Sequence, residues 1–299
     1  MLQNLFLNSL EQGLVYGIMV LGVFITFKIL KFSDLTVEGS FPLGAAIAAS
    51  LIVNGYSPFF ATLAAFFAGA LAGCITGFLN TKAGISDLLS GILTMTSLYS
   101  INLRIMGRPN IPLLNQPTIY SIIEDFLKNF SLPLSKHVHL LFFILFAIIV
   151  KFALDAFLKT QIGFALRATG DNPQMIRSQG VDTDLSKIVG LVISNSLVAL
   201  SGAMVAQYQG FGDAGMGVGT IVAGLASVII GDSLLGGNNI FISTLGVLLG
   251  SFLYRFSISL VLSFRLAQAS DLKLFTAIVV VIALTAPRFK NSLKTHERM

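Results

Sequence analysis

The chain contains repeated apolar runs that are long enough to cross a lipid bilayer, separated by short polar segments. A helix that crosses the hydrocarbon core needs about 20 predominantly apolar residues. Backbone N–H and C=O groups left unpaired in hydrocarbon cost several kcal/mol each, so such runs form helices or a closed barrel. The runs in this chain are continuous and lack the alternation of polar and apolar residues that is typical of barrel strands. We therefore predict an all-α fold, a polytopic integral membrane helical bundle.

The overall composition agrees with a membrane protein and argues against a nucleic-acid partner. Hydrophobic residues make up 55% of the 299 positions and only 11% are Asp, Glu, Lys or Arg, far from the balance of a soluble domain. The formal net charge of +5 comes from Lys and Arg spread through short loops and the tail, with no dense basic face. We therefore expect the chain to contact membrane lipid and no nucleic acid.

The bilayer length predicts nine transmembrane spans within a single transmembrane domain of residues 1–299. The range 38–53 is short and carries Glu38 and Pro42 at its start, so a broken or re-entrant helix there would raise the count to ten. A short basic tail follows at 287–299. The nine predicted spans lie near residues 5–27, 38–53, 58–79, 86–106, 138–158, 187–207, 218–235, 239–262 and 271–286.

The distribution of Lys and Arg predicts the orientation of the bundle. With a cytoplasmic C-terminus, most basic residues, including Lys28, Lys151 and Arg167, fall on the cytoplasmic side, as the positive-inside rule requires. An odd number of spans then leaves the N-terminus outside. The segment 107–136 faces outward in this scheme, and residues 119–130 are expected to form a short helix within it.

A polar cytoplasmic segment, residues 159–187, separates the fifth and sixth predicted spans and is expected to hold two short helices. Residues 163–170 give one helical turn that stops at a glycine. Asn172 as the N-cap, Pro173 in the first turn and Gly180 after the last turn define the second helix. A small helix held at the membrane surface suits contact with another molecule.

Apolar side chains and arginines on these two helices suit insertion into a groove on a soluble partner. The alternative is an amphipathic segment that lies on anionic lipid. The residues predicted to couple this segment to a partner are Phe164, Leu166, Arg167, Asn172, Pro173, Met175, Ile176 and Gly180.

The third predicted span carries small residues at every fourth position, and hence on one helix face. Such a ladder lets helix backbones approach closely, because lipid provides no hydrophobic drive for helix association. The pattern predicts a tightly packed bundle and says nothing about the substrate. The ladder consists of Ala61, Ala65, Gly69, Gly73 and Gly77.

Several kinds of chemistry are absent from the sequence. It contains no G-x-x-x-x-G-K loop, and not even a Gly-Lys pair, so the chain does not bind nucleotide phosphates in the P-loop manner. No Ser-His-Asp arrangement, paired carboxylates or metal-ligand cluster stands out in the spans. We therefore expect no enzymatic activity, cofactor or metal in this chain, and transport driven by a separate subunit.

Two segments resemble the permease subunits of ABC importers of the branched-chain amino acid and ribose type. One is G-F-A-L-R-A-T-G-D-N-P, residues 163–173, followed by Gly180 and Val181, which resembles their cytoplasmic coupling segment. The other is K-F-S-D-L-T-V-E-G-S-F-P-L-G, residues 31–44, which resembles the beginning of their second span. The resemblance continues at residues 91–95 and 223–231, and is closest to a branch sometimes linked to tryptophan or tyrosine uptake.

This resemblance implies a bacterial inner-membrane importer in which the chain pairs with a second copy or with a related permease. It also implies two cytoplasmic ATPase subunits, which bind the ATP, and an external substrate-binding protein. The chain lacks the E-A-A…G loop of maltose-type permeases, which separates it from that class.

Polar residues inside the predicted spans are candidates for the substrate pathway, although Ser and Thr often bond their own helix backbone instead. An arginine inside the eighth span is costly in lipid and should face the bundle, water or an acidic partner. It either binds a substrate carboxylate or holds the bundle together. The candidates are Thr94, Ser97, Tyr99, Asn102, Ser194, Asn195 and Arg255.

Two other classes of protein are alternatives to the importer subunit. A secondary transporter driven by an ion gradient would need carboxylates buried in mid-span, and the acidic residues were expected near span ends. A membrane-embedded enzyme would need a convergent catalytic set, which the sequence does not show. The acidic residues in question are Asp34, Glu38, Asp87, Asp155 and Asp232.

Overall fold

The computed structural model describes residues 2–129, 138–237 and 239–263 and the single positions 278 and 281. Its elements, in chain order, are α1 Leu2–Phe24, the π-helical turn η1 Ile25–Ile29, α2 Val37–Val53, α3 Pro58–Thr81, α4 Asp87–Met106, β1 Asn110–Pro112, α5 Ile119–Asn129, α6 Val138–Leu158, α7 Gln161–Asp171, α8 Pro173–Ser178, α9 Thr183–Gln209, β2 Phe211–Asp213, α10 Thr220–Leu235 and α11 Ile240–Ser263.

Each of the first eight predicted spans coincides with a helix, and the ninth, 271–286, lies outside the described residues. The helical bundle is thereby confirmed, while the count of nine or ten spans stays a prediction. Two of the helices, α2 with 17 residues and α10 with 16, are apolar but short for a complete crossing. Within the part of the chain that the structure describes, five helices are long and apolar enough to cross a membrane: α1 together with η1, α3, α6, α9 and α11.

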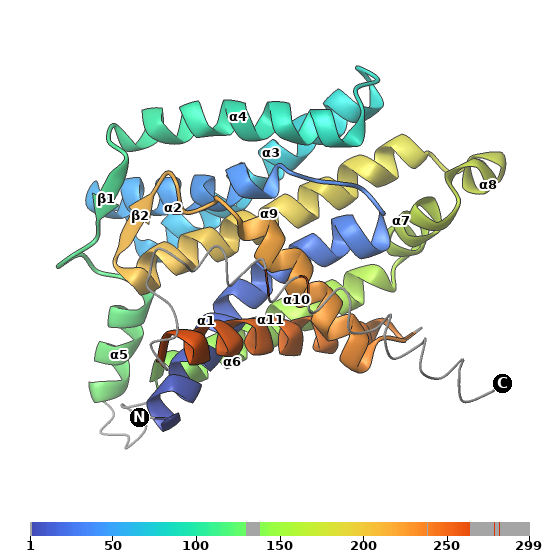
Figure 1. The fold of residues 1–299 in the computed structure, drawn as a ribbon. Coiled ribbons are helices and arrows are strands. Elements are labelled where there is room, and N and C mark those ends of the chain that lie inside the picture. Colours follow the sequence, from blue (N-terminus) through green and yellow to red (C-terminus); the bar gives the residue numbers. More distant parts are fainter. Residues whose placement is uncertain (1, 130–137, 238, 264–277, 279–280, 282–299) are drawn as a thin grey trace, which may run out of the picture.

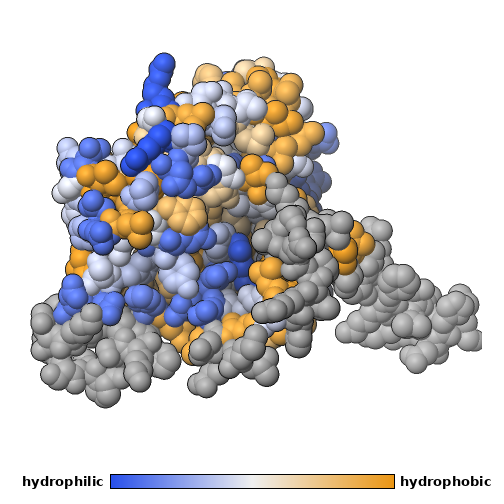
Figure 2. Space-filling view, turned by 60° about the vertical axis from the view of Figure 1, so that its left-hand side comes forward, coloured by the Kyte–Doolittle hydropathy of each residue, from blue (hydrophilic) through white to orange (hydrophobic). Residues whose placement is uncertain are grey.

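The bundle has two distinct ends (Figure 1). The coupling helices α7 and α8 lie at one end. The antiparallel β1–β2 pair, with Ile111 opposite Gly212, lies at the other end together with α5 and the beginning of α1. The beginning of α1 and the coupling helices therefore lie at opposite ends, as an odd number of spans between them requires. Figure 2 brings the β1–β2 end forward and shows hydrophilic and hydrophobic residues mixed over it.

The small-residue ladder of the third span packs against α9, as predicted. A Cβ atom added at Gly69 would lie 2.3 Å from the carbonyl oxygen of Asn195, and one added at Gly73 would lie 2.2 Å from that of Leu191. Ala61 is fully buried on the same face. The two backbones therefore approach at a distance that larger side chains would prevent.

The chain between α1 and α2 is irregular and enters the interior of the bundle. After η1, Lys31 adopts a positive φ of 54°, which is uncommon for a residue other than glycine. The first turn of α2 then meets the middle of α9, where Ser40 donates to the Oδ1 of Asn195 at 2.7 Å. Asn195 lies twelve residues into a helix of 27, so α2 begins near the mid-depth of the bundle. The irregular chain precedes α2, and α2 itself runs unbroken from Val37 to Val53, so the helix is not broken within the predicted range 38–53.

Three charged residues, Lys151, Asp155 and Asp34, are more deeply buried than the sequence indicated. Lys151 was expected on the cytoplasmic side, but its side chain is 3% exposed inside α6 and its Nζ lies 2.5 Å from Asp155. Asp155 also accepts a hydrogen bond from Thr244 of α11 at 2.7 Å. The pair at positions i and i+4 neutralises both charges within the bundle, so neither needs water. Asp34 is buried as well, at 2% exposure. Asp34 and Asp155 lie near the ends of predicted spans, as expected, but the burial of both side chains was not predicted.

Candidate coupling surface and translocation pathway

The first coupling helix, α7, is longer than the single turn predicted and does not stop at Gly170. Thr160 caps its N-terminus by accepting from the backbone N–H of Gly163 at 3.2 Å, and the helix continues to Asp171. Gly170 serves close packing instead. A Cβ atom there would lie 1.8 Å from the carbonyl oxygen of Ile29, the last residue of η1. The glycine therefore lets the backbone of α7 lie directly on the end of the first span.

Further contacts hold α7 against the bundle. Leu166 is fully buried, and its Cδ1 would lie 2.9 Å from a Cβ atom at Gly190 of α9, where Leu30 also packs. Lys31 and Asp171 form an ion pair of 3.0 Å at the rim. Both side chains of that pair are well exposed, so it contributes at most about 1 kcal/mol. The packing of Leu166 and Gly170 is the main anchor of α7.

The second coupling helix, α8, has the predicted ends. The Oδ1 of Asn172 accepts from the backbone N–H of Met175 at 3.0 Å, and Pro173 occupies the first turn. Gly180 follows the last turn with a φ of +85°, the left-handed conformation expected of a helix-terminating glycine. Ile176 is the one residue of α8 that is buried.

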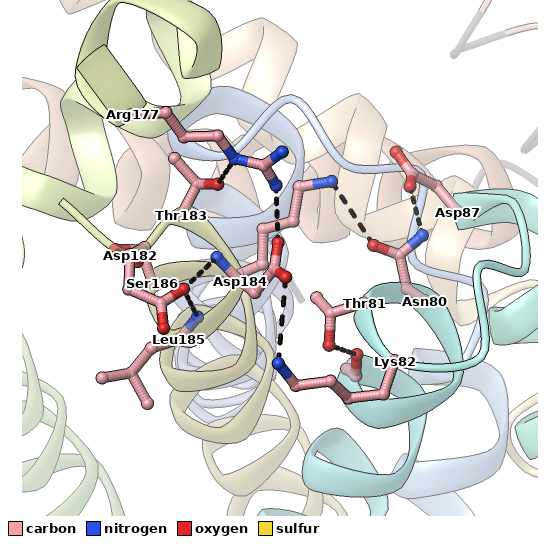
Figure 3. Close-up of polar contacts among 12 residues, drawn as sticks. Asn80, Thr81, Lys82, Asp87, Arg177, Asp182, Thr183, Asp184, Leu185 and Ser186 are labelled. Carbon is pink, nitrogen blue, oxygen red and sulfur yellow. Dashed lines mark hydrogen bonds and ion pairs between the residues drawn. The ribbon is translucent and has the colours of Figure 1, made fainter. Parts of the chain in front are cut away.

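A polar network holds the corner between α8 and α9 (Figure 3). Arg177 donates to the Oγ1 of Thr183 at 2.5 Å and to the Oδ1 of Asp184 at 2.7 Å. The other carboxylate oxygen of Asp184 lies 4.0 Å from Lys82, at the end of α3. Asp182 caps α9 by accepting hydrogen bonds from the backbone N–H groups of Leu185 and Asp184. These two hydrogen bonds lower the pKa of its carboxyl group.

The turn between α3 and α4 joins the same network. Lys187 of α9 lies 3.4 Å from the Oδ1 of Asn80, whose amide donates to Asp87 at 2.7 Å (Figure 3). The coupling segment is thus linked by polar contacts to a second turn that lies far away in the sequence. This link could not be predicted, because nothing in the local sequence pattern pairs Asn80 with Lys187.

The exposed part of α7 and α8 is smaller than predicted. Phe164 is 55% exposed and Met175 50% exposed, as expected for residues that contact a partner. Leu166 and Ile176 were predicted to be exposed as well, but both are buried, because they anchor their helices to the bundle. We call Phe164 and Met175, together with the exposed Ile162, the coupling surface.

Arg167, also predicted to contact a partner, lies at the edge of this surface. Its guanidinium group lies 5.6 Å from the centre of the Phe164 ring. It also lines a cavity of about 440 Å³ together with Lys28 and Asp171. Arg167 is thus turned partly toward the junction of α1, α7 and α11.

Most of the predicted pathway residues form structural hydrogen bonds. Thr94 and Ser97 donate to carbonyl groups of their own helix, and Ser194 donates to the carbonyl oxygen of Gly22 in α1 at 2.8 Å. Asn195 donates to the buried carboxylate of Asp34 at 2.8 Å. These bonds occupy the side chains: those of Thr94 and Ser97 stay within α4, while those of Ser194 and Asn195 join α9 to α1 and to the segment before α2.

Arg255 faces the bundle, as predicted for an arginine at this depth. Its guanidinium carbon lies 3.4 Å from the centre of the Tyr16 ring, which in turn stacks on Phe41 with ring centres 5.5 Å apart. The attraction between a cation and the face of an aromatic ring partly compensates for the loss of hydration of the cation. This contact joins α11 to α1 and α2, and whether Arg255 also meets substrate stays a prediction.

Tyr99 and Asn102 are brought together on the wall of one cavity of about 240 Å³. It lies between α4, the first turns of α2 and the loop before α10, and Glu38 also lines it. Asn102 is completely buried. Tyr99 and Asn102 are thus predicted pathway residues that border open space shared by several elements, whereas Glu38 was not among the predicted site residues.

Comparison with known proteins identifies the class. Residues 5–284 match the family described as branched-chain amino acid transport system, permease component. The chain therefore belongs to this family of ABC-type permeases, and it is a multi-pass membrane transport protein.

Individual relatives narrow the relationship. The chain is 46% identical to a tyrosine transport system permease protein of Clostridioides difficile, over 96% of this chain and 93% of that protein. It is 36% identical to an uncharacterized protein of Rickettsia prowazekii, over 95% of this chain and 98% of that protein. A ribose import permease protein of Haemophilus influenzae is 26% identical over 96% of this chain and 86% of its own length. No solved structure shows significant similarity to the chain.

Proposed function

We propose that this chain forms the translocation pathway of an ABC importer for an aromatic amino acid, with tyrosine as the first substrate to test. The family assignment supports a permease, and the 46% identical relative is named as a tyrosine transport permease. The cavity beside Tyr99 and Asn102 is compatible with a small solute, because its volume of about 240 Å³ is below the roughly 300–1,000 Å³ of drug-sized sites.

The single observation that best supports coupling to a separate ATPase is the contact between Gly170 and Ile29. Because α7 lies backbone to backbone on the end of the first span, a push on α7 displaces α1 directly. The coupling surface gives a soluble subunit apolar side chains to hold. ATP binding and hydrolysis would take place in that subunit, which biases the bundle between two conformations.

The proposed assembly contains two permeases, either two copies of this chain or this chain with a related one. Two cytoplasmic ATPases and an external substrate-binding protein complete it. The end of the bundle that carries α7 and α8 would face the cytoplasm of a bacterial cell, because Lys28, Lys31 and Lys82 gather at that end. The C-terminus, which lies outside the described residues, is proposed to be cytoplasmic from the distribution of Lys and Arg in the sequence.

Reconstitution tests this proposal. The permease, its ATPase and its binding protein are placed in proteoliposomes, and uptake of radiolabelled tyrosine is measured with ATP on the ATPase side. We expect uptake that requires both ATP and the binding protein, and that stops when the ATPase carries a substitution in its hydrolytic glutamate. Uptake by the permease alone, driven by an ion gradient, would instead identify a secondary transporter.

A further inference from the structure

The two short apolar helices, α2 and α10, begin beside each other inside the bundle. The backbone N–H of Gly219, the N-cap of α10, donates to the Oε1 of Glu38 in the first turn of α2 at 3.0 Å. A Cβ atom at Gly217 would lie 2.0 Å from the carbonyl oxygen of Glu38. Discontinuous helices that meet near the middle of the bilayer are a common way for transporters to build a solute site.

The cavity of about 240 Å³ opens at this junction. Its walls are mostly apolar and aromatic, from Pro42 of α2, Met95 and Tyr99 of α4 and Val218 before α10. An apolar enclosure with a few fixed polar groups is typical of a site for a small organic molecule.

The polar groups at the cavity have unused capacity to accept hydrogen bonds. The Oε1 of Glu38 accepts from Gly219, and its Oε2 accepts no hydrogen bond from any other described residue. Asn102 donates to the carbonyl oxygen of Gly39 at 3.2 Å, while its Oδ1 has no hydrogen-bond partner in the described structure. A buried acceptor without a partner is costly, so a ligand that donates to it gains affinity.

The charge of the cavity selects the kind of ligand group. Glu38 carries a carboxylate, and neither Lys nor Arg is among the described residues that line the cavity. A carboxylate within a membrane bundle is expected to pair with a cation. The complementary ligand is therefore an ammonium group attached to an apolar or aromatic body.

We propose that the junction of α2, α4 and α10 is a substrate site of the permease, in which Glu38 holds the ammonium group of an aromatic amino acid. Asn102 accepts a further hydrogen bond from the substrate, and the body of the substrate rests against Met95 and Tyr99. This site rests on the proposed function, because it takes the importer's substrate from the external binding protein during transfer.

The test measures ligand-induced thermal stabilisation of the permease–ATPase complex in detergent. The ligands are tyrosine, tyramine, which lacks the carboxylate, and 3-(4-hydroxyphenyl)propionate, which lacks the ammonium. We expect tyrosine and tyramine to stabilise the complex and the propionate to have no effect. In Glu38→Gln, which keeps an oxygen to accept from Gly219, we expect the affinity for both amines to fall about 10- to 100-fold.

A matched pair of substitutions on one helix separates the cavity from general effects on α4. Thr96 lines the cavity and Ser97 does not, although both bond to a carbonyl group of α4. Thr96→Phe should fill the cavity and remove binding of tyramine, whereas Ser97→Phe should leave it unchanged. Equal affinities in the wild type and Glu38→Gln, equal binding of the propionate, or no stabilisation of the wild type by tyramine would each overturn the site.

The two proposals fail in different ways. An absence of ATP-dependent tyrosine uptake by the wild type would contradict the proposed function. Stabilisation of that same protein by tyramine, abolished by Glu38→Gln and Thr96→Phe, would still support an amine site. Normal tyrosine uptake with an unchanged KM in Glu38→Gln would support the importer and contradict the site.

Discussion

The helices α7 and α8 follow one another in the same polar segment, yet they are attached to the bundle in different ways. The backbone of α7 touches the end of the first span at Gly170, and its Leu166 is completely buried. In α8 one side chain, Ile176, is buried, and Arg177 bonds forward to the start of α9. The two helices therefore differ in how firmly the transmembrane bundle holds them.

This difference assigns separate tasks to the two helices. A helix packed on η1 and α9 moves together with them, whereas a helix held by one apolar side chain and a surface network adjusts its angle at low cost. We infer that α7 transmits movement to the bundle and that α8 fits the contact to the ATPase. Four changes test this contrast, in order of decreasing effect.

The largest effect is expected from the two neighbouring apolar residues of α7. Leu166→Ala leaves a cavity in a fully buried site and should lower the free energy of unfolding by about 2–5 kcal/mol. Phe164→Ala removes an exposed ring and should leave thermal stability nearly unchanged, while it weakens co-purification of the ATPase. Similar losses of stability in both variants would contradict the assigned roles.

A smaller change in the free energy of unfolding is expected from Gly170→Ala, and its sign distinguishes helix propensity from close packing. Helix propensity alone predicts that the alanine stabilises α7 by about 1 kcal/mol. The carbonyl group of Ile29 occupies the space of the added methyl group, so we expect a loss of about 1–3 kcal/mol instead. Thermal unfolding in detergent gives the sign, and ATPase activity without tyrosine uptake would show that the contact also carries coupling. A stabilised and fully active Gly170→Ala protein would exclude α7 as a tightly packed transmitter.

A substitution that strains the backbone at Gly180, after the end of α8, should lower the free energy of unfolding by less than Gly170→Ala does. Gly180 has a φ of +85° and no neighbouring atom within 4 Å of an added Cβ, so a substitution acts through the backbone alone. Gly180→Val should cost about 1–2 kcal/mol and reduce uptake more than ATPase activity. Gly180→Asn is the matched control, since Asn tolerates this conformation, and it should retain most uptake. Equal uptake by the two variants would contradict the claim that this position requires a residue that tolerates the left-handed conformation.

The smallest effect is expected at the rim of α7. Lys31→Glu and Asp171→Lys each break an exposed ion pair and should change stability by at most about 1 kcal/mol, with restoration in the double variant. Unfolding at low and high salt provides the measurement, because exposed pairs weaken as ionic strength rises. A loss well above this value would mean that the pair, and not the apolar packing, anchors α7.

The sequence predicts well those features that depend on local pattern. The caps at Asn172 and Gly180 depend on residues a few positions apart, and the structure confirms both. The ladder through Gly69 and Gly73 follows helical spacing, and it meets α9 as a packing surface should. The helices at the first eight predicted spans follow from hydropathy for the same reason.

Features that depend on distant partners were missed or misread. Gly170 reads as a helix stop in isolation, and only the position of Ile29 shows that it is a packing residue. The sequence predicts Lys151 on the cytoplasmic side, whereas in the structure it pairs with the buried Asp155, which also accepts a hydrogen bond from Thr244. Hydropathy also gives no signal that Glu38 meets the start of α10, because the contact joins segments about 180 residues apart.

The most direct test of the central claim is to link α7 covalently to the end of the first span and to measure transport. Cysteines are placed at positions 31 and 171 in a Cys74→Ser background, and a short cleavable bismaleimide joins them in the reconstituted importer. If α7 moves as one body with the first span, ATP-dependent uptake persists after linking. Loss of uptake that returns when the linker is cleaved would show that the two elements must separate, and would contradict the account.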